Sequence, residues 1–126
     1  MSTRVLLSLK PQFADAILEG RKRFEFRKAL YRRTDVTRIV LYASSPVQRV
    51  VGEFEVDTVL SMAPDDLWHA TWKGAGITRG YFDDYFGGRE VGHALGVRLV
   101  KRYVRPRRLL QDYGVSFPPQ SFMYLD

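Results

Sequence analysis

The chain has 126 residues and no cysteine, so we expect one domain spanning residues 1–126, and disulfides, thiolate metal sites and cysteine nucleophiles are excluded. Apolar residues form 45% of the chain, which favours a folded core, but no apolar run is long enough for a membrane span or a signal peptide, so we expect a cytoplasmic protein without membrane contact. The net charge of +6 favours polyanionic partners, and with only two histidines we expect neither a metal nor a cofactor.

The first half of the chain predicts a strand, a helix and three further strands. Pro11 suits the first turn of the helix, and Gly20 suits its end. In the strand that follows, Phe24 and Phe26 share one face, which we expect to lie in the core, because alternate residues of a strand point the same way. The predicted elements occupy residues 5–9, 11–19, 22–28, 38–43 and 50–60.

The second half predicts two short helices and then two strands. Pro64 opens the first helix, and Thr78 caps the second. A strand over residues 93–104 is expected to end before Pro106, and a short turn or helix and a last strand follow. The whole order predicts an α+β fold with a mostly antiparallel sheet curled into a β-barrel and flanked by short helices.

Positive charge is concentrated at the two ends of the chain. Residues 1–40 have a net charge of +6, residues 41–96 of −4 and residues 97–126 of +4. If the two ends meet in space, they form one basic face that attracts nucleic acid; the alternative is a pair of solvated basic segments that keep the protein soluble.

Residues 20–27 join the first helix to the second strand and contain four cations and one carboxylate. Glu25 and Arg27 share a strand face, so the carboxylate can hold the guanidinium fork, which in turn suits a phosphate or a base edge. Lys22 is a compact charge suited to phosphate, and Arg23 adds to the same patch. The plainer alternative is a structural ion pair beside solvated cations.

The pattern G-x-K-x-x-E-x-R in this segment resembles the signature of the ASCH family, relatives of the RNA-binding PUA domains. Three further blocks are similar to that family: residues 7–20 before the signature, residues 42–46 with residues 51–54, and residues 118–122 near the end of the chain. Four blocks in the same order are far more specific than one motif.

The resemblance implies a small β-barrel with a basic cleft that holds RNA or a modified nucleotide. Lys22, Glu25 and Arg27 match the signature, and Lys10, Ser44, Ser45 and Gln120 match positions in the other blocks. With these residues we also expect Arg23 and Tyr42 at the cleft. The function predicted in this way is a nucleic-acid-binding module. The alternative is a small hydrolase acting on nucleosides or RNA, either a ribonuclease or an N4-acetylcytidine amidohydrolase, with Lys22 and Glu25 as its catalytic residues.

The amidohydrolase alternative is weakened by one position. Similar bacterial proteins that deacetylate N4-acetylcytidine use a lysine, a threonine and a glutamate. Lys22 matches their lysine, but Glu25 stands where their nucleophilic threonine falls. A carboxylate does not replace an activated hydroxyl without a change of mechanism.

Several other features have two interpretations. The basic residues of segment 97–108 either track a nucleic-acid backbone or protect an edge strand. Tyr31, Tyr42 and Tyr103 either stack on bases or pack in the core. The aromatic residues of the two short helices are expected to pack those helices onto the barrel, and the alternative is a protein-binding patch. The candidates in these helices are Trp68, Trp72, Tyr81, Phe82, Tyr85 and Phe86.

Overall fold

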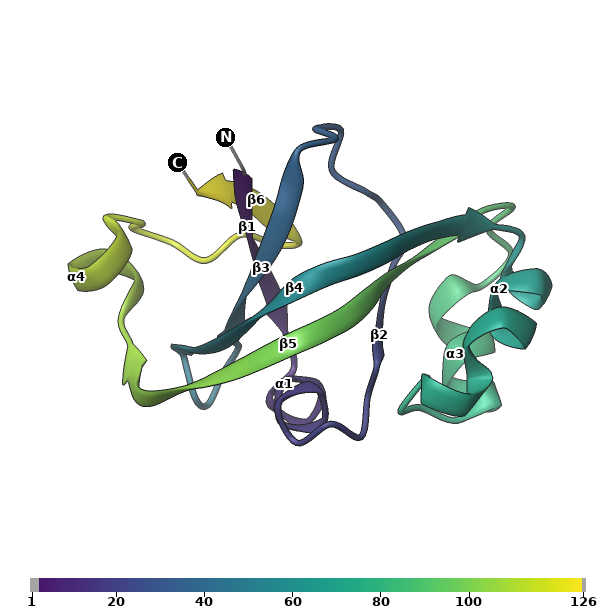
Figure 1. Ribbon diagram of the computed structural model, residues 1–126, viewed down its shortest axis with the longest axis horizontal. Coiled ribbons are helices and arrows are strands. Elements are labelled where there is room, and N and C mark those ends of the chain that lie inside the picture. The colour runs from purple at the N-terminus through teal and green to yellow at the C-terminus, as the bar shows by residue number, and fades with distance from the viewer. Residues whose placement is uncertain (1–2, 126) are drawn as a thin grey trace.

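A single mixed sheet organises the computed structural model, which describes residues 3–125 (Figure 1). Its strands are β1 (Thr3–Leu9), β2 (Phe24–Arg27), β3 (Val36–Ala43), β4 (Arg49–Met62), β5 (Gly92–Arg107) and β6 (Phe122–Leu125). The helices are α1 (Pro11–Leu18), α2 (Pro64–Thr71), α3 (Arg79–Phe86) and α4 (Leu109–Tyr113), with a 3-10 turn η1 (Trp72–Gly74) between α2 and α3.

The α+β class is confirmed, but the sheet does not close into a barrel. The strand order is β2-β5-β4-β3-β1-β6, and within residues 3–125 the edge strands β2 and β6 are not paired with each other. β1 pairs in parallel with β3, and the other neighbouring strands are antiparallel. Closure fails because β2 and β6 have only four residues each, too few to supply a continuous seam of hydrogen bonds.

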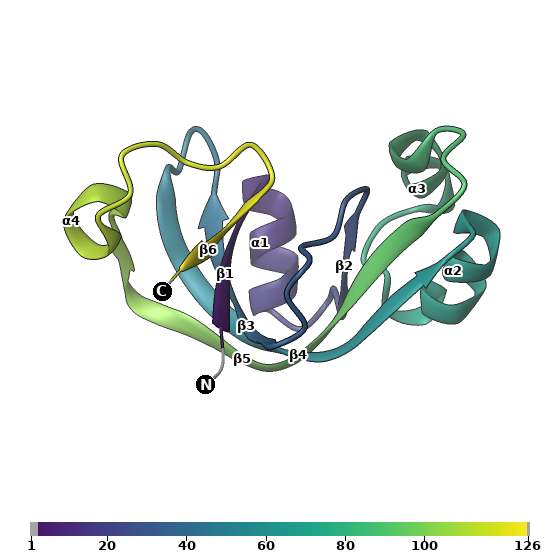
Figure 2. The ribbon, with the colours of Figure 1, turned by 90° about the horizontal axis from the view of Figure 1, so that it is seen from above.

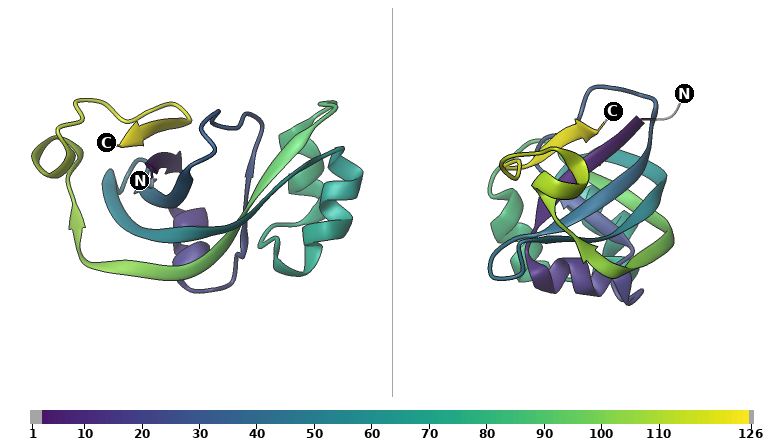
Figure 3. Two further views of the ribbon diagram at one scale, coloured as in Figure 1. Left: turned by 45° about the horizontal axis from the view of Figure 1, so that its top comes forward. Right: turned by 90° about the vertical axis from the view of Figure 1, so that its left-hand side faces the viewer.

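The sheet is strongly curled. β4 and β5 form a long arc, and α1, β1, β2 and β3 lie on its concave side (Figure 2). The end-on view in Figure 3 shows the strands crossing as they do in a barrel with one side left open. Register shifts along the β4–β5 pair interrupt the ladder at three places, which increases local twist and bends both strands.

Two predicted strand boundaries were wrong. β2 covers Phe24–Arg27 and is shorter than predicted, because the turn after α1 continues to Lys22, whose backbone N–H donates to the carbonyl of Ala16. β5 continues beyond Pro106 to Arg107. The ladder shifts register there, so the missing N–H of proline breaks no regular pair, and Val50 pairs with Arg107.

Three apolar clusters stabilise the fold. The largest lies between α1 and the sheet and includes Ile17, Leu41 and Phe54, all fully buried. The second joins the α4 end of the sheet to β6. The third packs α2 and α3 against β2 and β5 through Phe26, Phe82 and neighbouring side chains. The third cluster positions α3 beside β2, and the candidate site lies between them. No helix among residues 3–125 combines the length and apolar character needed to cross a membrane.

Candidate nucleotide-binding site

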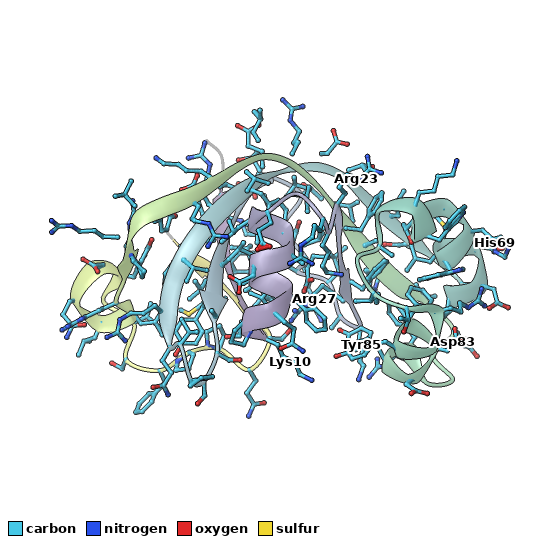
Figure 4. The ribbon with its side chains drawn as sticks, turned by 90° about the horizontal axis from the view of Figure 1, so that it is seen from below. Lys10, Arg23, Arg27, His69, Asp83 and Tyr85 are labelled. Atoms are coloured by element: carbon cyan, nitrogen blue, oxygen red, sulfur yellow. The ribbon has the colours of Figure 1, made fainter. Side chains whose placement is uncertain are left out.

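A hollow of about 150 Å³ lies where α1, β2 and α3 meet. Lys10 precedes α1 and Lys22 follows it, whereas Glu25 and Arg27 come from β2, and all four side chains line the hollow. Three cations and one carboxylate therefore face the same space, which favours an anionic ligand. The side chains of Lys10, Arg27 and Tyr85 are labelled in Figure 4, near the ends of α1 and β2.

The buried ammonium of Lys22 is the most unusual group in the hollow. The residue is only 2% exposed, and its Nζ donates to the carbonyl of Ala75 at 2.9 Å. Nζ also lies 4.7 Å from the ring centre of Phe26 and 5.5 Å from that of Phe13. Burial lowers the pKa of Lys22 below its ordinary value, while the nearby Glu25 carboxylate partly offsets that effect.

Glu25 and Arg27 form an ion pair that is almost fully buried. Arg27 Nη1 donates to Glu25 Oε2 at 3.1 Å, and the two side chains are 12% and 6% exposed. Their strand face was predicted to be opposite that of Phe26, which packs with α2 and α3 in the third apolar cluster but also reaches the lining of the hollow. Both faces are nevertheless buried at this point, because the curled sheet encloses one face and α2 and α3 cover the other. A buried carboxylate with such a partner is held in one orientation.

Arg27 also connects the two open edges of the sheet. Its Nη2 donates to Ser121 Oγ, next to β6, and its Nη1 lies 3.5 Å from the carbonyl oxygen of Ser8 in β1. Ser8 Oγ in turn donates to the carbonyl of Pro119 at 2.6 Å. A side-chain network therefore joins β2 to β1 and β6, where backbone pairing is missing.

Aromatic rings form the α3 side of the hollow. Tyr81 packs edge-on against Phe13 with ring centres 5.4 Å apart, and Lys10 Nζ lies 5.8 Å from the Tyr81 ring centre. Tyr85 lies one helical turn further along α3, and its burial raises the pKa of its hydroxyl. Tyr85 is therefore an uncharged hydrogen-bond donor at neutral pH.

The structure brings together only some of the predicted site residues. Lys10, Lys22, Glu25 and Arg27 line the hollow. Tyr42 does not, because it is 5% exposed and packs in the second apolar cluster. The remaining predicted positions also lie outside the lining of the hollow, and they are Arg23, Ser44, Ser45 and Gln120.

Each of these remaining positions has a clear location. Arg23 precedes β2 and lines a separate hollow beside Trp72, where its backbone N–H donates to the carbonyl of Gly74 (Figure 4). Ser44 is half-buried and Ser45 exposed in the turn between β3 and β4. Gln120 is exposed, and its neighbour Ser121 makes the contact with Arg27.

The sequence interpretation missed the contributions of Ser8, Ser121, Tyr81 and Tyr85. All the aromatic residues of α3 were expected to pack it onto the sheet; Phe82, Phe86 and Tyr85 do so, whereas Tyr81 lies outside that cluster. Tyr81 and Tyr85 are four residues apart, so they share a helix face of their own, and their hydroxyl groups were the available signal. Trp72 was also misplaced, because it is 54% exposed.

The remaining alternatives are resolved in part. Tyr31 and Tyr103 are buried in the core, as Tyr42 is, so none of the three offers a free ring for stacking. Among residues 3–125 no three histidine, aspartate or glutamate side chains gather as metal ligands would.

The backbone at Gly76 packs directly against Lys22. Its φ is +68°, and a Cβ atom there would lie 2.6 Å from Cβ of Lys22. We expect Gly76→Ala to lower the free energy of unfolding by about 2–3 kcal/mol, from backbone strain and displacement of Lys22 together. Gly114→Ala is the matched control, because φ is also +68° and no atom lies within 4 Å. Urea titrations should show a loss of about 1 kcal/mol for this control; equal losses would refute the contact with Lys22.

Comparison with known proteins supports this description. The model of the ASCH domain family matches residues 7–103. A Zymomonas mobilis protein named ASCH domain-containing ribonuclease is 32% identical over 123 residues, which cover 95% of this chain and 82% of that protein. The crystal structure of ASCH from Zymomonas mobilis superposes with a TM-score of 0.86 at 32% identity and covers 98% of this chain and 87% of that one.

A second kind of relative is much longer than this chain. The protein of Ureaplasma parvum named large ribosomal subunit protein uL22 is 27% identical over 124 residues. The matched region covers 96% of this chain but only 39% of the Ureaplasma protein. The same fold unit is therefore similar to part of a larger protein.

Proposed function

Because the chain belongs to the ASCH domain family, we propose that it binds single-stranded RNA and cleaves it at the hollow between α1, β2 and α3. The similar Zymomonas protein is named a ribonuclease, and most of its length is covered by the match. RNA supplies the anionic phosphate that three cations beside one carboxylate favour.

The observation that carries the proposal is the buried ammonium of Lys22 beside the Glu25–Arg27 pair. Burying a charge is costly, and buried charges of perturbed pKa are concentrated at functional sites. The contact with the Ala75 carbonyl and the two ring faces favour the protonated form of Lys22. In our proposal Lys22 stabilises the negative charge that develops on the phosphate during cleavage.

Glu25 is the group that takes up a proton in the proposed reaction. A carboxylate held beside cations and next to the proposed phosphate position suits the role of general base. Glu25 accepts the proton of the ribose 2′-hydroxyl, the 2′-oxygen attacks phosphorus, and the bond from phosphorus to the 5′-oxygen breaks. The leaving 5′-oxygen takes a proton from water, the hydroxide that remains takes the proton from Glu25, and the products are a 2′,3′-cyclic phosphate and a 5′-hydroxyl. Arg27 orients Glu25 through their hydrogen bond.

The proposal predicts that Glu25→Gln lowers kcat for RNA cleavage by about a hundredfold or more, while RNA binding persists. Glutamine keeps an acceptor for Arg27 but does not take up the proton. Cleavage of a labelled RNA and of DNA of the same sequence, followed on denaturing gels, gives the measurement. Glu19→Gln is the control, since Glu19 pairs with Arg21 on the exposed end of α1.

Two outcomes would count against this function. Cleavage of the DNA at the same rate would exclude attack by the 2′-hydroxyl. Deacetylation of N4-acetylcytidine with the RNA left intact would instead favour the amidohydrolase reaction, in spite of Glu25 at the position of the threonine.

A further inference from the structure

The C-terminal half of β5 lies at the α4 end of the molecule (Figure 1), and its side chains line a hollow larger than the first. This β5 groove is lined by residues 101–107 together with Asp112 and has a volume of about 570 Å³. Its lining includes the cations Lys101, Arg102, Arg105 and Arg107 against the single carboxylate of Asp112. Residues 97–111 as a whole contain six cations and no acidic residue.

Several of these cations are free to bind a ligand. Within residues 3–125, neither Lys101 nor Arg105 has a side-chain hydrogen bond or an ion pair. Arg102 approaches its partner Asp15 only to 3.8 Å. Lys101, Arg102 and Arg105 are exposed, and so is Val104, which lies between Arg102 and Arg105 on the strand, so these side chains are open to solvent although Tyr103 is buried.

One cation of the β5 groove is held in a fixed orientation. The guanidinium of Arg107 lies 3.8 Å from the ring centre of Tyr103, and its Nη1 donates to the hydroxyl of Tyr113 at 3.0 Å. The Tyr103 hydroxyl donates to Glu53, which fixes the ring beneath the guanidinium. A stacked, oriented arginine beside exposed cations suits the phosphates of a nucleic-acid strand.

The small volume of the first hollow also indicates that a bound strand makes contacts elsewhere on the protein. At about 150 Å³ it is smaller than the sites of roughly 300–1,000 Å³ that enclose small molecules. It therefore encloses only part of a nucleotide, and most of the binding free energy for a strand has to come from contacts outside it. Phosphate contacts supply most of the sequence-independent affinity of nucleic-acid-binding proteins.

We propose that the β5 groove binds the phosphate backbone of the RNA strand whose scissile phosphate lies in the first hollow, so that the substrate is polymeric RNA; this inference rests on the proposed function. Strand β5 runs from the first hollow to the β5 groove. His93 of β5 pairs with Arg27 at the first hollow, and Arg105 lies twelve residues further along β5. At about 3.3 Å per residue the path along β5 is roughly 40 Å, which a free nucleotide does not span.

The test compares two double variants that remove the same charge. Lys101→Ala with Arg105→Ala changes the β5 groove, whereas Arg32→Ala with Arg89→Ala removes two exposed arginines elsewhere. Fluorescence anisotropy measures the binding of a labelled RNA strand long enough to span the path, and of a dinucleotide, across a series of salt concentrations. We expect the groove variant to bind the strand about tenfold more weakly, with a salt slope smaller by about 1.4 for two lost phosphate contacts, and to bind the dinucleotide as before.

Each outcome of this comparison either supports or overturns the proposed role of the β5 groove. Equal losses in both double variants mean that only net charge matters and overturn the proposal, as does an unchanged affinity in the groove variant. Tight binding of labelled polyglutamate that is lost in the groove variant would assign the groove to acidic polypeptides instead. If the groove variant alone loses strand binding while the wild type cleaves no RNA, the groove inference stands and the proposed cleavage fails.

Discussion

We expect Lys22→Met to raise the melting temperature of the protein and to lower the rate of RNA cleavage at least a hundredfold. The buried ammonium is replaced by an apolar side chain of similar length, which packs against Phe13 and Phe26. Replacing buried charge by well-packed apolar groups is often neutral or stabilising. We expect a gain of about 1 kcal/mol, or about 3–5 °C, because Glu25 keeps Arg27 as its partner.

The loss of cleavage follows from the role proposed for Lys22. Methionine has no charge to stabilise the phosphate, and the loss of one such group costs about 10²–10³ in rate. Calorimetry and cleavage assays on the same preparation measure both effects. A variant that is less stable and also inactive would show that Lys22 has a structural role, and Lys73→Met controls for the removal of an exposed lysine.

The lowered pKa of Lys22 adds a pH dependence with a definite sign. Between that lowered pKa and the ordinary value of 10.5, the unfolded chain keeps a proton that the folded chain has released. The free energy of unfolding contributed by Lys22 therefore rises with pH across this window. In Lys22→Met that contribution is absent, so the difference in stability between variant and wild type should shrink as the pH approaches 10.5. A constant difference over this range would mean that folding does not lower the pKa of Lys22.

The second large effect concerns Arg27. We expect Arg27→Ala to lower the free energy of unfolding by about 3–5 kcal/mol, because the carboxylate of Glu25 is left buried without its partner. The change also removes the link from β2 to Ser121 and to the Ser8 carbonyl across the open side of the sheet. RNA cleavage should fall with it, since Glu25 loses its orientation.

The chain contains a matched pair for comparison. Arg21 and Glu19 are also two residues apart and lie closer together, at 2.8 Å, but their side chains are 63% and 47% exposed. Arg21→Ala should change the free energy of unfolding by less than about 1 kcal/mol, because solvent screens an exposed pair. Urea titrations measure both losses, and similar values would show that burial does not strengthen the Arg27 pair.

A double variant separates the ion pair from the other contacts of Arg27. Glu25→Gln combined with Arg27→Met removes both charges and leaves no unpaired ion. The free energy of unfolding that this double variant loses should be smaller, by about 1–3 kcal/mol, than the sum of the losses in the single variants Glu25→Gln and Arg27→Met. Strict additivity would mean that Arg27 acts through Ser121 and Ser8 alone.

Local structure followed closely from local sequence. The helix from Pro11 to Leu18, the cap that Thr78 provides for α3 and the turn at Gly114 depend on neighbouring residues, so periodicity and capping signals were sufficient. The pairing of Glu25 with Arg27 was also open to prediction, because residues two apart on a strand share a face. The sequence by itself therefore determined most of the elements and placed Lys10, Lys22, Glu25 and Arg27 among the candidate site residues, but it did not separate them from Arg23.

Only the tertiary structure decided what surrounds these residues. The parallel pairing of β1 with β3 and the curl of the sheet bring Ser8 and Ser121 to Arg27 from 19 and 94 residues away. Tertiary packing also makes Lys22 a buried cation against the carbonyl of Ala75 and Tyr42 a core residue of the second apolar cluster. Contacts between distant segments depend on how the sheet bends and how the helices dock on it. Neither the bend nor the docking can be predicted from the spacing of residues along the chain.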